Sequence, residues 1–314
     1  MPEIRLSVVT PCYRSQATLP LLVAQLHEQL GSLCAQYEII LVVDGSPDDT
    51  AEVARQLAAA DPERVRAVVL RRNYGQHNAL MAGIARARFP IVVTMDDDLQ
   101  HRPDQVSALI APLADPDVDL VYGVAEVEEH GIARSAASRM VKAGLAASGV
   151  ENAGHVSAFR AFRRELRDGW SQVNDPFVSL DVVLSWATTS VRAVPVRMDQ
   201  RAIGTSAYTF SRLMRHTWNM VTGYGTLPLR IVTWIGVALS FLGFAALVVV
   251  IVAYVSGSIE VAGFTSTIAL IALFNGAILL SLGILGEYLG RLHFRSMHRP
   301  GYLVRSDSGD HQEP

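Results

Sequence analysis

The first 125 residues alternate short apolar runs with longer segments whose apolar positions recur at helical spacing. The apolar runs predict strands at 6–10, 37–43, 65–70, 91–95 and 120–124. The segments between them predict helices over 17–30, 50–60, 76–87 and 103–114. Gly31 is expected to end the first of these helices, and Pro103 suits the first turn of the last. This alternation is typical of an α/β fold with a mostly parallel sheet that is covered on both faces.

Farther along the chain, the pattern changes to two long apolar runs, 231–255 and 261–286, without Asp, Glu, Lys or Arg. As a helix, either run can cross the roughly 30 Å hydrocarbon core of a bilayer. A buried helical hairpin in a soluble core is the weaker alternative, because such helices rarely stay uncharged for so long. We therefore expect a transmembrane hairpin over 229–290, with a lipid bilayer as its partner.

The placement of arginine predicts how the hairpin is oriented. Arg212, Arg215 and Arg230 precede the first run, four arginines follow the second, and the loop between the runs contains no Lys or Arg. By the positive-inside rule, both termini and the globular part are expected on the cytoplasmic side of a multi-pass membrane protein. The N-terminus has no basic region followed by an apolar one, so no signal peptide is expected.

These patterns divide the chain into a globular domain at 1–209, an amphipathic juxtamembrane helix at 210–228, the hairpin at 229–290 and a cytoplasmic tail at 291–314. Segments 134–148 and 210–224 have apolar residues at helical spacing and basic residues on other faces, which suits a membrane surface. Amphipathic helices that cover the sheet are the alternative. The end of the tail, from Ser306, is small and polar, and we expect it to be disordered.

Composition supports the membrane interpretation and excludes other classes. The chain is 50% hydrophobic and only 18% charged, with a mean hydropathy of +0.25. Its net charge of −3 argues against a nucleic-acid partner. Cys12 and Cys34 are the only cysteines, too few for a disulfide framework or a zinc site.

The polar residues with chemical potential follow the predicted strands directly. In open parallel sheets, ligands bind at the carboxyl ends of the strands. Asp96 and Asp98, two apart after the fourth strand, can converge on one Mg²⁺ or Mn²⁺ ion that also binds a diphosphate. An acidic turn that caps the next helix is the alternative. Asp44 and Asp48 fit a turn and a helix N-cap, although their strand-end position also allows contact with a nucleotide base or ribose.

Seven segments in order carry a resemblance to a known family. They are SVVTPCYRSQATLP, EIILVVDGSPDDT, LRRNYGQHNALMAGIARA, IVVTMDDDLQHRPDQV, RAIGTSAYTFSRL, TLPLR and EYLGRLHFRSMHRPGYLV. Together they resemble bacterial family 2 glycosyltransferases acting on polyprenyl phosphate, of the dolichyl-phosphate mannose synthase group. The most similar branch is that of the undecaprenyl-phosphate 4-deoxy-4-formamido-L-arabinose transferases. The resemblance covers nearly the whole chain.

The resemblance implies a GT-A, Rossmann-like domain joined to two C-terminal transmembrane helices. It implies an inverting enzyme at the cytoplasmic face of the inner membrane that moves a sugar from a nucleotide-sugar, with UDP favoured, to undecaprenyl phosphate. Such a product would feed cell-envelope glycan or lipid modification. A divalent cofactor, Mg²⁺ or Mn²⁺, and a homo-oligomeric state are also consistent with it.

The resemblance also assigns roles to individual residues. Asp96 and Asp98 match the D-x-D positions that hold the metal and the donor diphosphate, and Arg201 matches a catalytic phosphate contact. Arg134 and Ser138 match an acceptor-phosphate pair that lies on one helix face. The donor-side candidates, by motif or by position at the strand ends, are Pro11, Tyr13, Asp44, Asp48, Asn73, Asp97 and Gln100.

The sequence departs from the family pattern at four positions. Val43 stands where many relatives have the first Asp of D-D-G-S, and the acceptor side has lost charge at Ala125, Gly154 and Ala207. One hypothesis is that His155 or Arg160 compensates, and another is that the acceptor or the sugar differs. Asp181 is interpreted as a capping or core-edge residue rather than a catalytic base.

Two other functions compete with single transfer to a lipid phosphate. A processive polysaccharide synthase would require a Q-x-x-R-W run, which neither Gln172 nor Gln200 begins, and more than two spans. A non-catalytic membrane adaptor with a degenerate GT-A fold is the third candidate. The retained Asp96 and Asp98 argue against it.

Overall fold

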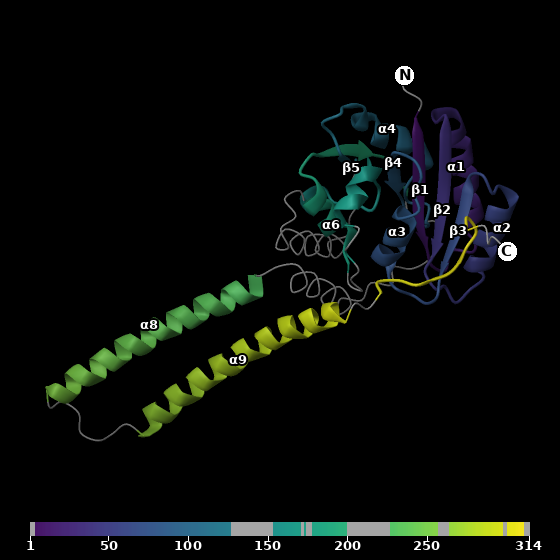
Figure 1. Ribbon diagram of the computed structural model, residues 1–314. Coiled ribbons are helices and arrows are strands. Elements are labelled where there is room, and N and C mark those ends of the chain that lie inside the picture. Colours follow the sequence, from purple (N-terminus) through teal and green to yellow (C-terminus); the bar gives the residue numbers. More distant parts are fainter. Residues whose placement is uncertain are drawn as a thin grey trace. The chain divides into compact units, whose positions relative to one another are not determined.

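A computed structural model of the chain describes residues 4–126, 153–170, 173, 178–199, 227–256, 264–297 and 300–310 (Figure 1). The chain forms two compact units. The first combines Met1–Thr217 with His298–Pro314, and the second is Trp218–Met297. The helices expected at 134–148 and 210–224 lie outside the described residues.

The first unit is built on an eight-stranded sheet with the order β7-β5-β6-β4-β1-β2-β3-β8. The strands are β1 (Arg5–Cys12), β2 (Gln36–Val43), β3 (Val65–Leu70), β4 (Ile91–Thr94), β5 (Leu120–Ala125), β6 (Arg160–Arg163), β7 (Val191–Val196) and β8 (Val304–Asp307). The β4-β1-β2-β3 block is parallel, as is the pair β5 and β7, whereas β6 and β8 are antiparallel to their neighbours. The expectation of a mostly parallel α/β sheet is confirmed.

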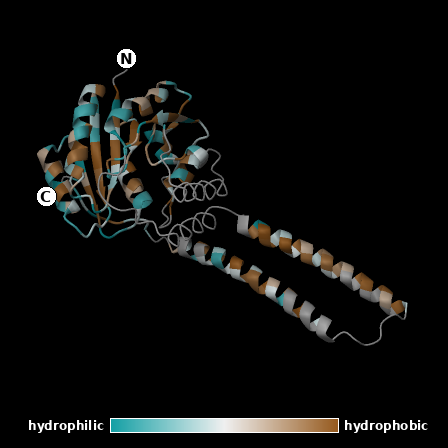
Figure 2. Cartoon of the chain, turned by 180° about the vertical axis from the view of Figure 1, so that it is seen from behind, coloured by the Kyte–Doolittle hydropathy of each residue, from teal (hydrophilic) through white to brown (hydrophobic). Residues whose placement is uncertain are grey.

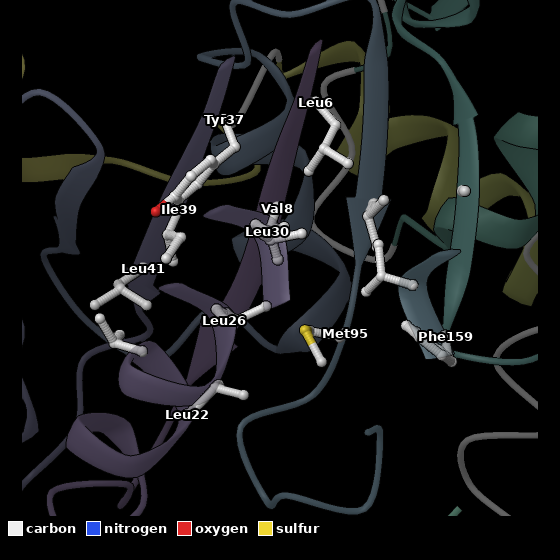
Figure 3. Packing of buried hydrophobic residues seen from close by; sticks show 14 of the residues in the cluster. Leu6, Val8, Leu22, Leu26, Leu30, Tyr37, Ile39, Leu41, Met95 and Phe159 are labelled. Carbon is white, nitrogen blue, oxygen red and sulfur yellow. The ribbon is translucent and has the colours of Figure 1, made fainter. Parts of the chain in front are cut away.

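Helices cover both faces of the central strands, which explains why these strands are apolar along nearly their whole length. The helices α1 (Leu19–Leu33), α2 (Thr50–Ala60) and α4 (Val106–Ile110) pack on one face, and α3 (Gln76–Ile84) and α6 (Leu180–Ala187) on the other. On the first face, Leu22, Leu26 and Leu30 of α1 lie over Val8 of β1 and Leu41 of β2 (Figure 3). Each such buried side chain contributes about 1.5–3 kcal/mol.

One glycine lets α3 approach the sheet closely. A Cβ atom at Gly83 would lie 2.4 Å from a Val9 methyl carbon and 2.8 Å from a Val42 methyl carbon. The helix therefore packs directly on β1 and β2. Because α3 begins at Gln76, soon after β3 ends, this packing holds its first residues near the carboxyl edge of the sheet.

Three predicted helices have different boundaries. The first continues through Gly31 to Leu33, because buried leucines keep it against the sheet at a cost of about 1 kcal/mol for the glycine. The third ends at Ile84 rather than at residue 87. The segment 103–114 divides into the 3₁₀ turn η1 (Pro103–Gln105), α4 and a second turn, η2 (Ala111–Ala114). Pro112, near the start of η2, has no amide hydrogen to continue α4.

The expectation that the chain is disordered from Ser306 is wrong for the part that the structure describes. Strand β8 pairs antiparallel with β3, with Val68 opposite Asp307. The Asp307 side chain is 1% exposed, and its carboxylate oxygens lie 2.7 Å from Arg66 Nε and 2.5 Å from Arg86 Nε. Paired charges, which a count of polar residues does not reveal, hold the strand in place.

The second unit contains two long helices, α8 (Leu227–Val255) and α9 (Phe264–Ser296). They meet where the Phe274 ring approaches Gly243, at which an added Cβ would lie 3.3 Å from the ring. Apolar residues run along both helices (Figure 2). Within the described residues, no helix has the length and apolar character needed to cross a membrane.

Candidate active site

The carboxyl ends of β4, β1, β2 and β3 lie side by side at one edge of the sheet, as the strand order and the parallel register require. The loops that follow these strands begin at Tyr13, Asp44, Arg71 and Met95. The structure therefore brings together the donor-side candidates that the sequence predicts at separate strand ends.

Asp97 links the loop after β4 to the loop after β1. Its Oδ2 atom accepts the Tyr13 amide hydrogen at 3.0 Å and a hydrogen bond from the Ser15 hydroxyl. Burial, with a smaller contribution from the neighbouring Asp96 and Asp98, raises the pKa of Asp97 to about 6, and the two hydrogen bonds oppose this rise. The described contacts of the Asp97 carboxylate are thus with the protein backbone and a hydroxyl, which position the loop.

Asp96 and Asp98 are half-buried and are held by polar neighbours. The Asp96 Oδ1 atom accepts a hydrogen bond from Gln76 Nε2 at 2.7 Å, so the start of α3 helps to orient this carboxylate. The Asp98 Oδ1 atom accepts the Gln100 amide hydrogen at 3.1 Å. Leu99, which lies between Asp98 and Gln100 in this tight turn, has a φ of +64°, a left-handed conformation uncommon for leucine.

His101 completes the turn and was not predicted from the sequence. The Asp96 amide donates a hydrogen bond to His101 Nδ1 at 2.9 Å, and His101 is 6% exposed. Burial lowers the pKa of His101, although the nearby Asp96 and Asp98 act in the opposite direction. Both observations favour a neutral imidazole with its hydrogen on Nε2.

Asp44 connects the end of β2 to the end of β3. Its two carboxylate oxygens accept the amide hydrogens of Tyr74 at 2.7 Å and Gly75 at 2.8 Å. Burial raises the pKa of Asp44, and the two hydrogen bonds oppose that rise. The next residue, Gly45, has a φ of +56°, and a Cβ there would lie 2.2 Å from the carbonyl carbon of Arg72. Only glycine fits this close approach of two loops.

Asp48 organises the turn before α2, as the local pattern predicts. Its Oδ1 atom accepts hydrogen bonds from the hydroxyls of Ser46 at 2.5 Å and Thr50 at 2.6 Å. These bonds outweigh the effect of burial and lower the pKa of Asp48. The Ser46 hydroxyl in turn accepts the Arg14 amide hydrogen at 2.8 Å, which links this turn to the loop after β1.

The other predicted residues differ in their exposure. Pro11 is buried in β1 opposite Val42, whereas Tyr13 and Asn73 are exposed at the edge of the sheet. The Arg72 guanidinium stacks on the Tyr74 ring, 4.5 Å from its centroid. Arg134, Ser138 and Arg201 lie outside the described residues.

The hypothesis that Arg160 supplies charge to the acceptor is wrong. Arg160 is 2% exposed and forms an ion pair with Asp181, which is also buried. The Tyr122 hydroxyl lies 3.3 Å from the same carboxylate. The charge of Arg160 is neutralised inside the core, and the interpretation of Asp181 as a core-edge residue agrees with this arrangement.

The residues after β4 fit a divalent cation. Carboxylate oxygens from Asp96 and Asp98 are the hard ligands that Mg²⁺ and Mn²⁺ prefer. In the part of the chain that the structure describes, no three His, Cys, Asp or Glu side chains cluster so as to hold a metal by themselves. Mg²⁺ in proteins is commonly bound by one or two carboxylates together with substrate phosphates, which is the number of carboxylates that this pair offers.

An open sheet of this topology, with paired carboxylates after β4, defines a GT-A type of nucleotide-sugar domain. The fold is similar to that of glucosyl-3-phosphoglycerate synthase from Mycobacterium tuberculosis, whose structure was solved with Mn²⁺ and UDP-glucose. The TM-score is 0.50 and the identity 20%, over 69% of this chain and 77% of the other.

Sequence comparison identifies the family. The model of the family described as "Glycosyl transferase family 2" matches residues 7–170. Undecaprenyl-phosphate 4-deoxy-4-formamido-L-arabinose transferase from Klebsiella pneumoniae is 33% identical over 307 residues, covering 97% of this chain and 94% of its own. The transferase of the same name from Sodalis glossinidius is 33% identical over 304 residues, covering 96% and 93%.

This chain belongs to glycosyl transferase family 2, and it is a glycosyltransferase enzyme. The resemblance predicted from the motifs is confirmed.

Proposed function

We propose that this enzyme transfers a sugar from a nucleotide-sugar to a polyprenyl phosphate, with undecaprenyl phosphate as the acceptor. The observation that carries the proposal is the Asp96 and Asp98 pair at the carboxyl edge of the sheet, in a chain 33% identical to named undecaprenyl-phosphate transferases. UDP is the favoured nucleotide, because the resemblance to this branch favours a UDP-linked donor. The reaction is a single displacement that inverts the anomeric carbon.

Asp96 and Asp98 are the residues that would hold Mg²⁺ or Mn²⁺, which would neutralise the charge that develops on the departing nucleoside diphosphate. Gln76 orients Asp96 through its side-chain amide, and the Asp97 link to the first loop holds the donor side together. Asp44 and Asp48 fix the loops after β2 and β3, which would flank the nucleotide.

The acceptor needs little help from a base. A phosphate monoester is already largely ionised at pH 7 and can attack as its own nucleophile, so alignment and charge stabilisation dominate catalysis. Asp181, paired with the buried Arg160, is poorly placed to take a proton. We assign the phosphate contacts to Arg134, Ser138 and Arg201, on the strength of the family motifs.

We also propose that α8 and α9 anchor the enzyme as a hairpin in the inner membrane, with both termini and the first unit on the cytoplasmic face. Support comes from the uncharged runs and the arginine placement. Large apolar side chains are exposed on α8, including Trp234 at 72%, Phe241 at 72% and Phe244 at 66%. A contiguous apolar surface of this kind is stable in lipid and costly in water.

The test is an assay of purified, detergent-solubilised enzyme with undecaprenyl phosphate, Mn²⁺ or Mg²⁺, and a panel of UDP-, GDP- and dTDP-sugars. Nucleoside diphosphate release and the mass of the lipid product would be followed. We expect one metal-dependent glycosyl-phosphoryl lipid, with activity at least about 100-fold lower in Asp98→Asn. Asp117→Asn, the same change at an exposed position before β5, should retain full activity.

Three results would contradict the proposal. A product with many sugar units would indicate a processive synthase. Equal activity in Asp98→Asn would remove the carboxylate pair from the mechanism. Donor binding without any lipid product would show that the enzyme glycosylates a different acceptor or serves as an adaptor.

A further inference from the structure

The turn that contains the candidate metal ligands is closed by a hydrogen bond between a backbone amide and the side chain of His101. His101 lies five residues after Asp96, and its Nδ1 atom accepts the Asp96 amide hydrogen at 2.9 Å. Residues 96–101 therefore form a loop pinned at both ends, with the Leu99 φ of +64° and the hydrogen bond from Gln100 to Asp98 inside it. Both candidate carboxylates lie within this pinned loop.

The imidazole itself is fixed from outside the loop. It stacks on the Phe159 ring, with centroids 5.1 Å apart and planes 14° from parallel. Phe159 is fully buried, and the backbone of His101 forms an isolated bridge with Met198. The Gln100 carbonyl also accepts the Asp199 amide hydrogen at 3.0 Å. The imidazole is thus held by the surrounding core, and its hydrogen bond in turn fixes the position of the Asp96 amide.

We infer that His101 is a positioning residue for the metal and diphosphate site, which acts by holding the Asp96 amide and thereby the directions of the Asp96 and Asp98 carboxylates. The inference rests on the proposed function, because it assigns His101 a role in that same site. It requires a hydrogen-bond acceptor at the Nδ1 position, since a backbone amide can only donate.

Three substitutions separate this role from general packing. His101→Asn places an amide oxygen close to the Nδ1 position. His101→Gln carries the same amide one carbon farther out, and His101→Leu has nearly the shape of asparagine without an acceptor. Phe162→Leu is a matched control for loss of packing, because Phe162 is fully buried but belongs to the core on the opposite face of the sheet.

The experiment uses the full chain in detergent and measures Mn²⁺ binding by calorimetry in the presence of UDP, together with thermal unfolding. We expect His101→Gln and His101→Leu to raise the Kd for Mn²⁺ by about ten-fold or more, as is typical when a partner of metal-binding groups is removed. His101→Asn should restore most of the affinity. Phe162→Leu should lower the unfolding temperature and leave the Kd unchanged.

Two results would overturn the inference while leaving the proposed function intact. One is wild-type Mn²⁺ affinity in both His101→Gln and His101→Leu. The other is an affinity in His101→Asn as weak as in His101→Gln. Absence of Mn²⁺ binding by the wild type with UDP would instead overturn the metal part of the proposed function and the inference with it. If His101→Leu fails to fold, the comparison of Asn with Gln decides.

Discussion

Asp44 illustrates how single buried side chains hold the candidate donor site together. Its side chain connects two strand ends through the amides of Tyr74 and Gly75. A buried carboxylate is unfavourable unless hydrogen bonds satisfy it, and here two backbone donors do so. Burial nevertheless raises the pKa of Asp44, which shows that its charge is disfavoured in the folded state.

We expect Asp44→Ala to lower the free energy of unfolding by about 2 kcal/mol or more, because two buried amides lose their acceptor. Asp44→Asn should cost part of this loss, because its single amide oxygen can accept only one of the two amide hydrogens and its NH2 group faces the other donor. Urea denaturation followed by tryptophan fluorescence would measure both. A loss in Asp44→Asn as large as in Asp44→Ala would show that one acceptor oxygen is not enough, whereas wild-type stability in Asp44→Ala would contradict the role of the two hydrogen bonds.

Glycine substitutions test the close approach between the loops after β2 and β3. We expect Gly45→Ala to destabilise the first unit by more than about 2 kcal/mol, because a Cβ would clash with the Arg72 and Asn73 backbone and because φ is +56°. Gly31→Ala is the matched control. It lies inside α1 with open space around it, and it should stabilise the protein by up to about 1 kcal/mol. Thermal unfolding of both variants is the measurement, and a Gly45→Ala variant as stable as the wild type would contradict the clash.

At this scale, sequence patterns could place Asp96 and Asp98 at a strand end, because an apolar run followed directly by acids is typical of a buried strand that ends at the edge of a sheet. They could not identify Gln76 or His101 as partners of Asp96. Gln76 lies at the start of α3, a different element, and the role of His101 depends on a left-handed turn at Leu99 that leucine gives no reason to expect. Such contacts depend on tertiary packing and not on local spacing.

The outermost strand, β8, depends on charge pairs more than on apolar burial. Burial alone would raise the pKa of Asp307, but the hydrogen bonds from Arg66 and Arg86 outweigh it and lower the pKa. A carboxyl whose pKa is lower when folded than when unfolded stabilises the fold above its ordinary pKa of about 3.9. That stabilisation is lost as the pH falls through the lower, folded-state value.

We therefore expect β8 to detach from β3 as the pH falls below about 4, before the central strands open. Amide hydrogen exchange at Ser306, followed over pH, would detect this. Asp307→Asn should show faster exchange already at pH 7 and should lose the pH dependence that Asp307 causes. Identical exchange in the variant and the wild type would contradict the role of the ion pairs.

Among the elements, the long apolar strands could be predicted from the sequence, but the edge strand β8 could not. The boundaries of β3 and α2 agree with the periodicity, since both are defined by burial against the sheet. In contrast, β8 has the sequence Val-Arg-Ser-Asp, which lacks any apolar alternation, and its pairing depends on arginines more than 200 positions earlier in the chain. Local pattern carries no information about a partner so distant.

The molecule as a whole divides into a unit with a buried core and a unit that exposes apolar side chains along its helices. If α8 lies in lipid, an arginine near its middle should prevent stable insertion, at a cost of about 2.5–3.5 kcal/mol. Leu242→Arg places the charge near the middle of the helix, at a side chain that is 60% exposed, and Val255→Arg places it at the end of the helix. We expect alkaline carbonate to extract Leu242→Arg, while Val255→Arg and the wild type stay in the membrane fraction. Retention of Leu242→Arg would contradict a membrane position for α8.

Strand β8 also affects how the enzyme can be dissected. The sheet of the first unit contains strands from two separate segments of the chain. A shortened protein that stops after Thr217 would lack β8 and leave β3 as an unpaired edge strand. Such an edge can pair with other molecules and cause aggregation. A shortened protein in which a flexible linker joins Thr217 to His298 would keep that edge covered while removing the apolar helices. Crystallisation trials and soluble donor-binding assays should therefore begin from this internal deletion and not from a C-terminal truncation.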